Sequence, residues 1–239
     1  MSAASLTLTR PAGRPPMQRP KTRAARPKVA VDIVLFAIQH QRPVCYLVQL
    51  GRGASRGAWA FPGRLVEVGE LLDAAARREV ETVSGIRELY LEQLFTFGDP
   101  HRDPRAHVVS VAYLGLTYAP EAAAAGPKRY PAARWFPLDA LPNFAYDHAT
   151  IAEFAARRLR SKLEYTNIAQ SLLPPAFTFA ELAGVYSAIL TRKLDRRNFR
   201  RRVLATGLLR KVGVSRRGAH RPAVLYEFAQ RSLQTIEML

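Results

Sequence analysis

Charge divides this 239-residue chain into parts that cannot all play the same role. Residues 29–154 carry 12 basic and 14 acidic side chains, whereas residues 155–239 carry 17 basic and five acidic ones. The first 28 residues add seven basic groups and no acidic one. This division predicts a near-neutral globular domain joined to a basic domain whose partner is a polyanion such as nucleic acid.

Length and composition allow one large domain or two modest ones, because domains run to roughly 100–200 residues. With 48% hydrophobic residues the chain can bury a core, which excludes wholesale disorder. Residues 1–28 hold few large apolar side chains, so we expect a disordered basic tail. That tail could add non-specific phosphate affinity, or it could be a dispensable extension with an alternative start near Met17.

Cysteine usage and hydrophobicity bear on cellular location. The lone Cys45 excludes an internal disulfide and a cysteine-based zinc site, which suits a reducing cytosol. No uncharged apolar run approaches the roughly 20 residues of a membrane span, and residues 1–28 lack a signal-peptide core. We therefore expect a cytoplasmic protein with no membrane partner.

Residues 29–150 are expected to form an α/β domain. Apolar, β-branched runs separated by a short turn are typical of a hairpin, and apolar residues at helical spacing indicate helices. The expected strands are Ala30–Ile38, Val44–Leu50, His107–Leu116 and Ala133–Phe136, and the expected helices are Glu70–Ser84 and a segment from about Asp147 to Leu163. Strands precede and follow the first helix without strict alternation, which predicts an α/β/α sandwich with a mixed sheet.

The segment Trp59–Ile86 resembles the Nudix box. That pattern runs from a glycine through a first Glu to Arg-Glu, an apolar residue, a Glu-Glu pair and a closing glycine. Glu70 takes the first Glu place, and Arg78 and Glu79 take the Arg-Glu places. Arg64 occupies the place of the first glycine.

The Glu-Glu pair of the pattern is replaced by Thr82 and Val83. Nudix hydrolases hold Mg²⁺ with carboxylates on one helix face, since this ion prefers oxygen ligands. Glu79 persists, but its partner four residues on is Val83, and Glu81 points roughly 200° away around the helix. We therefore expect no metal and no required cofactor, and hydrolysis that is absent or feeble.

A ligand pocket is predicted from the charged residues of this domain. The turn before the strand His107–Leu116 presents Arg102 and Arg105, whose guanidinium forks could grip a diphosphate. The alternatives are a solvated loop here and a structural salt-bridge network around Glu70 and Arg78. The predicted effector-binding residues are Arg64, Glu70, Arg78, Glu79, Arg102 and Arg105.

The basic segment 176–239 predicts a winged helix-turn-helix. Thr178 and Glu181 form a capping box before an apolar helix, and Asp195 can cap a second, arginine-rich helix that Gly207 ends. A helix spanning Ile151–Pro174 is expected to connect the domains across residues 151–175, and it could supply a dimer contact. Helix, tight turn and basic helix are the arrangement in which the second helix reads the DNA major groove.

Two extended segments, Leu208–Val214 and Ala223–Phe228, are expected to form a wing around a basic tip. Any single arginine here could simply be a solvated residue, but the set is too concentrated for that reading. A membrane surface fits poorly because the hairpin lacks an apolar face. The predicted DNA-binding residues are Arg196, Arg197, Asn198, Arg200, Arg201, Lys211, Arg216, Arg217, His220 and Arg221.

Together, the Nudix box and the segment from Leu194 to Phe228 resemble the Nudix-related transcriptional regulators of NAD metabolism (NrtR). The resemblance covers about residues 29–230. It implies a homodimeric repressor that binds a palindromic operator near NAD biosynthesis or salvage genes. It also implies that the Nudix domain senses ADP-ribose, or a related NAD derivative, without degrading it.

Two other functions remain open at this point. One is an active Nudix pyrophosphatase acting on ADP-ribose-like nucleotides with an accessory nucleic-acid module, against which Thr82 and Val83 argue. The other is a protein-interaction scaffold, for which the basic wing would be unnecessary. Operator, effector and the direction of its effect are not encoded in any motif of the sequence.

Overall fold

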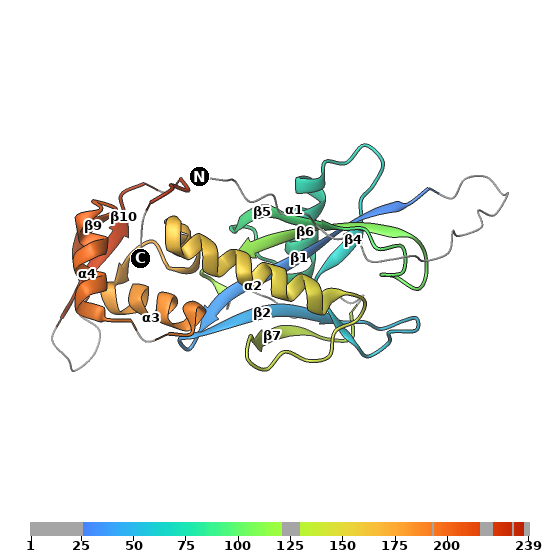
Figure 1. The fold of residues 1–239 in the computed structure, drawn as a ribbon, viewed down its shortest axis with the longest axis horizontal. Coiled ribbons are helices and arrows are strands. Elements are labelled where there is room, and N and C mark those ends of the chain that lie inside the picture. Colours follow the sequence, from blue (N-terminus) through green and yellow to red (C-terminus); the bar gives the residue numbers. More distant parts are fainter. Residues whose placement is uncertain (1–25, 121–129, 193, 216–221, 231, 237–239) are drawn as a thin grey trace, which may run out of the picture.

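The computed structural model describes residues 26–120, 130–192, 194–215, 222–230 and 232–236 (Figure 1). These residues form a large sheet between two helical layers and a small C-terminal domain. The elements of the first domain are β1 (Lys28–Gln39), β2 (Arg42–Gln49), β3 (Trp59–Ala60), β4 (Gly63–Leu65), α1 (Leu72–Ser84), β5 (Tyr90–Phe97), β6 (Val108–Leu116), β7 (Ala133–Pro137) and α2 (His148–Tyr165).

A seven-stranded mixed sheet forms the body of this domain. Five strands follow the order β3-β2-β1-β6-β5, while β4 pairs with β1 and β7 pairs with β2. β1 and β6 are parallel, and the other pairs are antiparallel. The expected hairpin forms as β1 and β2, and the residue assigned to the end of the tail, Lys28, is instead the first residue of β1.

The alternation of side chains along β1 explains the two helical layers. Val31 and Ile33 pack with the apolar face of α1, in a cluster that includes Val80. Val34 and Phe36 point to the opposite face and pack with α2, which lies across the sheet (Figure 1). The predicted α/β/α sandwich with a mixed sheet is confirmed.

The second domain is a winged helix. It contains a 3₁₀ helix, η2 (Ile168–Leu172), then β8 (Phe177–Thr178), α3 (Phe179–Leu190), α4 (Arg196–Ala205), β9 (Leu209–Ser215) and β10 (Ala223–Phe228). The capping box of Thr178 and Glu181 is present, and Asp195 accepts hydrogen bonds from the first backbone N–H groups of α4. A three-stranded sheet in the order β8-β10-β9 completes the domain.

The two domains share one hydrophobic cluster. Phe36 and Leu94 of the large sheet, Leu159 of α2, and Phe199 and Phe228 of the winged helix all belong to it. Packing of this kind transmits displacement because protein interiors are dense and deform little. The winged helix is therefore mechanically continuous with the α2 face of the sandwich.

The prediction of a helix through Pro174 is wrong. α2 ends at Tyr165, because Thr166 adopts an extended backbone and its Oγ1 donates to the carbonyl of Lys162 at 2.6 Å. Asn167 then bonds to Gln234 rather than continuing the helical ladder. Only the short η2 follows before Pro174 and Pro175, since proline lacks the backbone donor that a helix needs.

β5, an edge strand, was not expected from the sequence, because its charged and apolar residues do not alternate cleanly; Leu94 sits at an irregularity in its pairing with β6. In the described part of the chain, no helix combines the length and apolar character that crossing a bilayer requires.

Candidate ligand pocket and nucleic-acid surface

A salt-bridge network fixes the loop that leads into α1. Arg78 donates from Nε to Glu70 Oε1 at 2.8 Å, and its Nη1 lies 3.1 Å from Glu67 Oε1. Glu70 Oε2 also accepts from the backbone N–H of Glu67 at 3.0 Å. The hydrogen bonds from Arg78 lower the pKa of Glu70. These contacts support the structural reading of Glu70 and Arg78 over direct ligand contact.

Two positions of the Nudix helix that the pattern gives to glutamate hold Thr82 and Val83. Val83 is 1% exposed and packs in the core, while Thr82 Oγ1 donates to the carbonyl of Arg78 at 2.6 Å. Glu81 points to Arg87, 2.7 Å away, and Glu79 is buried. Among the residues described, no group of three or more His, Cys, Asp or Glu side chains is placed to hold a metal.

A cavity of about 430 Å³ opens beside β1 and β4. Lys28, Arg64 and Arg105 contribute positive charge to its lining, and Phe61, Tyr130 and Tyr146 contribute aromatic rings. Cationic groups and aromatic walls together suit an anionic nucleotide, whose phosphates and base need different surfaces. Of the six predicted effector-binding residues, Arg64 and Arg105 line this cavity, and Glu70, Arg78, Glu79 and Arg102 do not.

Arg102 does not face a ligand as predicted; its side chain is only 4% exposed. It donates from Nε and Nη2 to Asp147 at 2.9 and 2.6 Å, and it reaches Asp32 Oδ2 at 3.3 Å. No local sequence pattern predicts these contacts, because both carboxylates are remote from Arg102 in the chain. Arg102 therefore ties β1 to the start of α2, and Arg105 alone of the pair lines the cavity.

The floor of the cavity is a buried polar network around Asp32. Ser110 donates to Asp32 Oδ2 at 2.5 Å, and His148 Nε2 lies 3.6 Å from the same atom. His148 Nδ1 accepts the backbone N–H of Phe61 at 3.0 Å, which places the ring proton on Nε2, toward Asp32. A Cβ at Gly63 would lie 2.1 Å from Asp32 Oδ1, so only glycine fits there.

The Asp32 network gives folding a defined dependence on pH. Burial favours the neutral acid, but His148, Ser110 and Arg102 together lower the pKa of Asp32 from 3.8 to about 2. Because the folded-state pKa is the lower one, this carboxylate stabilises the fold above pH 4 and loses that effect as pH falls toward 2.

At neutral pH, we expect the free energy of unfolding of the wild type to exceed that of Asp32→Asn. A part of this difference, on the order of 2 kcal/mol, should depend on pH. Urea denaturation at several pH values measures it. The difference should narrow between pH 4 and 2, and a difference that stays constant over that range would contradict the assignment.

Tyr146 forms a wall of the cavity in an unusual backbone conformation. Its φ of 57° lies in the left-handed region, which bulky residues seldom occupy. The neighbouring residues hold it there, because Ala145 bonds to the carbonyl of Trp59 and Asp147 is held by Arg102. The Arg105 guanidinium lies 5.2 Å from the centroid of the Tyr146 ring. Backbone strain of this kind is often found at functional sites.

Several cavity residues were not identified from the sequence: Lys28, Asp32, Asp103, Tyr130, Tyr146 and His148. They come from four separate segments, and only Asp103 lies in a segment singled out from the sequence, the turn that presents Arg102 and Arg105. The one available signal was Asp32, a lone acid inside the apolar run Ala30–Ile38, since a buried carboxylate requires polar partners.

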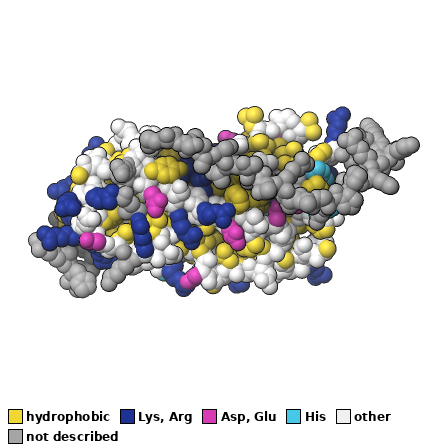
Figure 2. All heavy atoms as spheres, in the orientation of Figure 1, with side chains coloured by type: hydrophobic (Ala, Val, Ile, Leu, Met, Phe, Trp, Pro, Cys, Tyr) yellow, Lys and Arg dark blue, Asp and Glu magenta, His cyan; other side chains and the backbone are white. Residues whose placement is uncertain are grey.

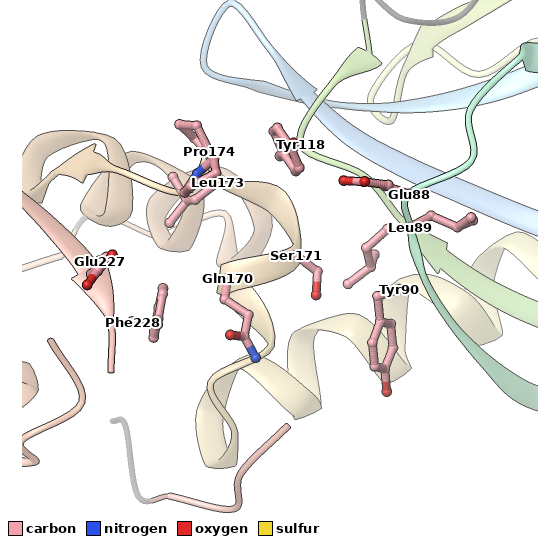
Figure 3. A pocket seen from close by; sticks show the side chains of 12 residues that line it. Glu88, Leu89, Tyr90, Tyr118, Gln170, Ser171, Leu173, Pro174, Glu227 and Phe228 are labelled. Atoms are coloured by element: carbon pink, nitrogen blue, oxygen red, sulfur yellow. The ribbon is translucent and has the colours of Figure 1, made fainter. Parts of the chain in front are cut away.

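A second cavity, of about 390 Å³, lies where the large sheet meets the winged helix (Figure 3). Glu88 and Tyr90 approach it from the sheet, and Gln170, Ser171 and Phe228 from the other domain (Figure 3). Its described lining contains carboxylates and no lysine or arginine. It is therefore poorly suited to a diphosphate, and the cavity beside β4 is the better ligand site.

The arginines of α4 form the candidate nucleic-acid surface. Phe199 and Val203 face the core, whereas Arg197 and Arg201, four residues apart, point away from it. Basic side chains are visible over this end of the molecule (Figure 2). The exposed members of the predicted set are Arg196, Arg197, Asn198, Arg200, Arg201 and Lys211.

Arg200 makes structural contacts outside α4, and the tip of the wing lies outside the described residues. Arg200 donates from Nη2 to the Tyr226 hydroxyl at 3.1 Å, and its guanidinium lies 5.4 Å from the Phe179 ring. It therefore also links α4 to the wing and to α3. Arg216, Arg217, His220 and Arg221 lie outside the described residues.

A Nudix sandwich joined to a winged helix defines a class of protein in which a small-molecule domain is attached to a DNA-binding domain. Comparisons with known proteins agree with both parts. Residues 26–157 match the model of the NUDIX domain, and residues 169–228 match that of the NrtR DNA-binding winged helix domain.

Relatives extend the match across both domains. The chain is 33% identical over 207 residues to the ADPR responsive transcriptional repressor NtrR of Acinetobacter baylyi, covering 85% of this chain and 82% of that protein. The Shewanella oneidensis NrtR crystal structure with a 27mer DNA superposes with a TM-score of 0.75 at 31% identity, covering 84% of this chain and 93% of that one. The chain belongs to the NrtR family, and the resemblance stated from its sequence is confirmed.

A second solved structure concerns the first domain alone. The NUDIX domain of Shewanella oneidensis NrtR complexed with ADP ribose matches with a TM-score of 0.50 at 28% identity, covering 59% of this chain and 94% of that one. The region of similarity therefore includes the cavity-bearing sandwich as well as the winged helix.

Proposed function

We propose that this protein is a DNA-binding transcriptional repressor whose Nudix domain senses ADP-ribose or a related NAD derivative. The observation that carries the proposal is the pairing of a winged helix bearing an exposed arginine face with a Nudix domain whose helix has Val83 in place of a carboxylate. The relatives named above support both the DNA and the nucleotide. The regulated genes proposed are those of NAD biosynthesis or salvage.

The ligand is assigned to the cavity beside β4. Arg64, Lys28 and Arg105 supply positive charge for a diphosphate. Tyr146 and Tyr130 supply aromatic surface of the kind on which a base can stack. A nucleotide carries both kinds of group, which a simple phosphate or an apolar metabolite does not.

DNA is assigned to α4 and the wing. Arg197 and Arg201 would reach base edges or phosphates from the major groove, and Lys211 would contact the backbone from the wing. We propose that it binds a palindromic operator as a homodimer, because two reading helices related by two-fold symmetry match such a site. The working location of such a regulator is the cytoplasm, with double-stranded DNA as its macromolecular partner.

A physical route joins the two sites. β1 carries Asp32 at the cavity and continues to Ile38 and His40, which line a cavity shared with α3 and Arg196. If ligand binding favours one packing of the end of β1 against α3 over another, it would change the placement of α4. Thermodynamic linkage then requires that DNA and ligand alter each other's affinity.

The second candidate function is an active pyrophosphatase for ADP-ribose-like nucleotides. The preserved Glu70, Arg78 and Glu79 favour it, while Val83 and the pairing of Glu70 with Arg78 argue against it. Mg²⁺-dependent turnover of ADP-ribose that Glu79→Gln abolishes would support the enzyme. We expect no such turnover.

The regulatory proposal predicts that ADP-ribose changes operator affinity by a measurable factor, because coupling free energies between sites are typically about 1–3 kcal/mol, or 5- to 150-fold. Fluorescence anisotropy of a labelled operator, titrated with protein at zero and saturating ADP-ribose, measures the factor. Equal affinities in the two titrations would rule out this form of regulation.

A further inference from the structure

Arg64 occupies a place that the Nudix pattern gives to glycine. It lies in β4, opposite Val31 of β1, and its side chain lines the ligand cavity. Its Nη2 donates to Glu67 Oε1 at 2.9 Å, and its side chain is 20% exposed. Its Nε is buried and has no hydrogen-bond partner among the described residues. A buried guanidinium N–H without a partner is costly, so it favours a ligand that supplies a hydrogen-bond acceptor.

The cavity must offset the charge of a diphosphate without a metal site. Hydrolases of this fold use a carboxylate-bound divalent cation, but the donor set here does not fit one: Val83 is apolar and Glu70 is held by Arg78. Among the other cations of the cavity, Arg105 is already paired in a bidentate manner with Asp103. Arg64 is the cation of β4, the strand that precedes the loop into α1.

We propose that Arg64 takes the electrostatic place of the missing divalent cation and binds the diphosphate of the ligand directly. This inference rests on the proposed function, because it concerns the same cavity and the same nucleotide. An arginine fork presents parallel donors to phosphate oxygens and stays charged at every physiological pH. Unlike a divalent cation, a guanidinium activates no water, so Arg64 would hold a diphosphate without supplying a nucleophile.

The consequence is nucleotide binding that is independent of metal. Isothermal titration calorimetry of ADP-ribose into wild-type protein should give equal affinities in excess EDTA and in excess Mg²⁺. Arg64→Ala should lose roughly 10- to 100-fold in affinity, because it removes charge-assisted hydrogen bonds. Arg64→Lys should lose less, since it keeps the charge and loses the fork.

Arg77→Ala is the matched control. Arg77 is an exposed arginine of α1 that does not line the cavity, so its removal changes the net charge equally and should leave the affinity unchanged. Circular dichroism checks that each variant is folded. The ion pair of Arg64 is with Glu67, whose side chain is 65% exposed, so its loss should cost little stability.

The outcomes separate this inference from the proposed function. Wild-type binding that requires Mg²⁺, or full affinity in Arg64→Ala, would overturn the role of Arg64 while leaving an ADP-ribose sensor in place. Failure of wild type to bind ADP-ribose under either condition would overturn the proposed effector and this inference together.

Discussion

Replacing Arg197 and Arg201 together by glutamate should abolish specific operator binding. The two side chains share the face of α4 opposite Phe199 and Val203, so they are the residues that a DNA groove would meet first. Each base-contacting arginine contributes about 1–3 kcal/mol, and reversal adds repulsion from the phosphates. We expect a loss of about 10³-fold or more, to the level of non-specific binding.

The same double variant should keep its fold and its ligand. Both arginines are exposed and remote from the cavity, so ADP-ribose affinity and the thermal midpoint should match wild type. Arg52→Glu, an exposed change on the Nudix domain, serves as the charge control and should bind operator nearly normally. Anisotropy with the operator measures each protein, and retained operator affinity in the double variant would remove α4 from the DNA interface.

The Arg102→Ala variant should be severely destabilised, although it lies in a segment that looks like a ligand-binding loop. Removing its guanidinium leaves Asp32 in the interior without one of its partners and frees Asp147 at the start of α2. Breaking a buried pair from one side costs about 3–5 kcal/mol. For a chain of this size that corresponds to a fall of roughly 6–20 °C in Tm.

Arg105→Ala is the comparison for Arg102→Ala. Its own side chain is 66% exposed although that of Asp103 is 6% exposed, so its loss should cost less stability than the loss of the buried Arg102. Because it lines the cavity, its loss should instead weaken ADP-ribose binding. Differential scanning calorimetry and ligand titration distinguish the two effects. The assignment fails if Arg102→Ala melts like wild type, or if both variants lose stability equally.

Regular elements could be predicted because their signals are local. The alternation of Ala30–Ile38, the capping box at Thr178 and the cap at Asp195 each concern residues close in the chain. Charge counting separated the domains for the same reason, since the arginines of α4 lie close together in the chain. The helix expected through Pro174 failed because its end depends on Gln234, which is remote in sequence.

The candidate cavity could be predicted only in part. Arg64 and Arg105 were found through the Nudix pattern and the turn before β6, but Arg102 was wrongly placed beside them. The structure separates Arg102 from Arg105 because Asp32 and Asp147 bind the first and Asp103 binds the second. Tyr146 and His148 enter the cavity through the path of the chain before α2, which no local pattern specifies.

Selection of genomic fragments bound by the full-length protein, with and without saturating ADP-ribose, tests the central claim most directly. A repressor that senses this nucleotide should recover a small set of fragments that share a palindrome and lie near NAD biosynthesis or salvage genes. ADP-ribose should change their recovery, and the Arg197→Glu, Arg201→Glu protein should recover none of them. Recovery of no enriched sequence, or of the same fragments to the same extent at saturating ADP-ribose, would contradict the account.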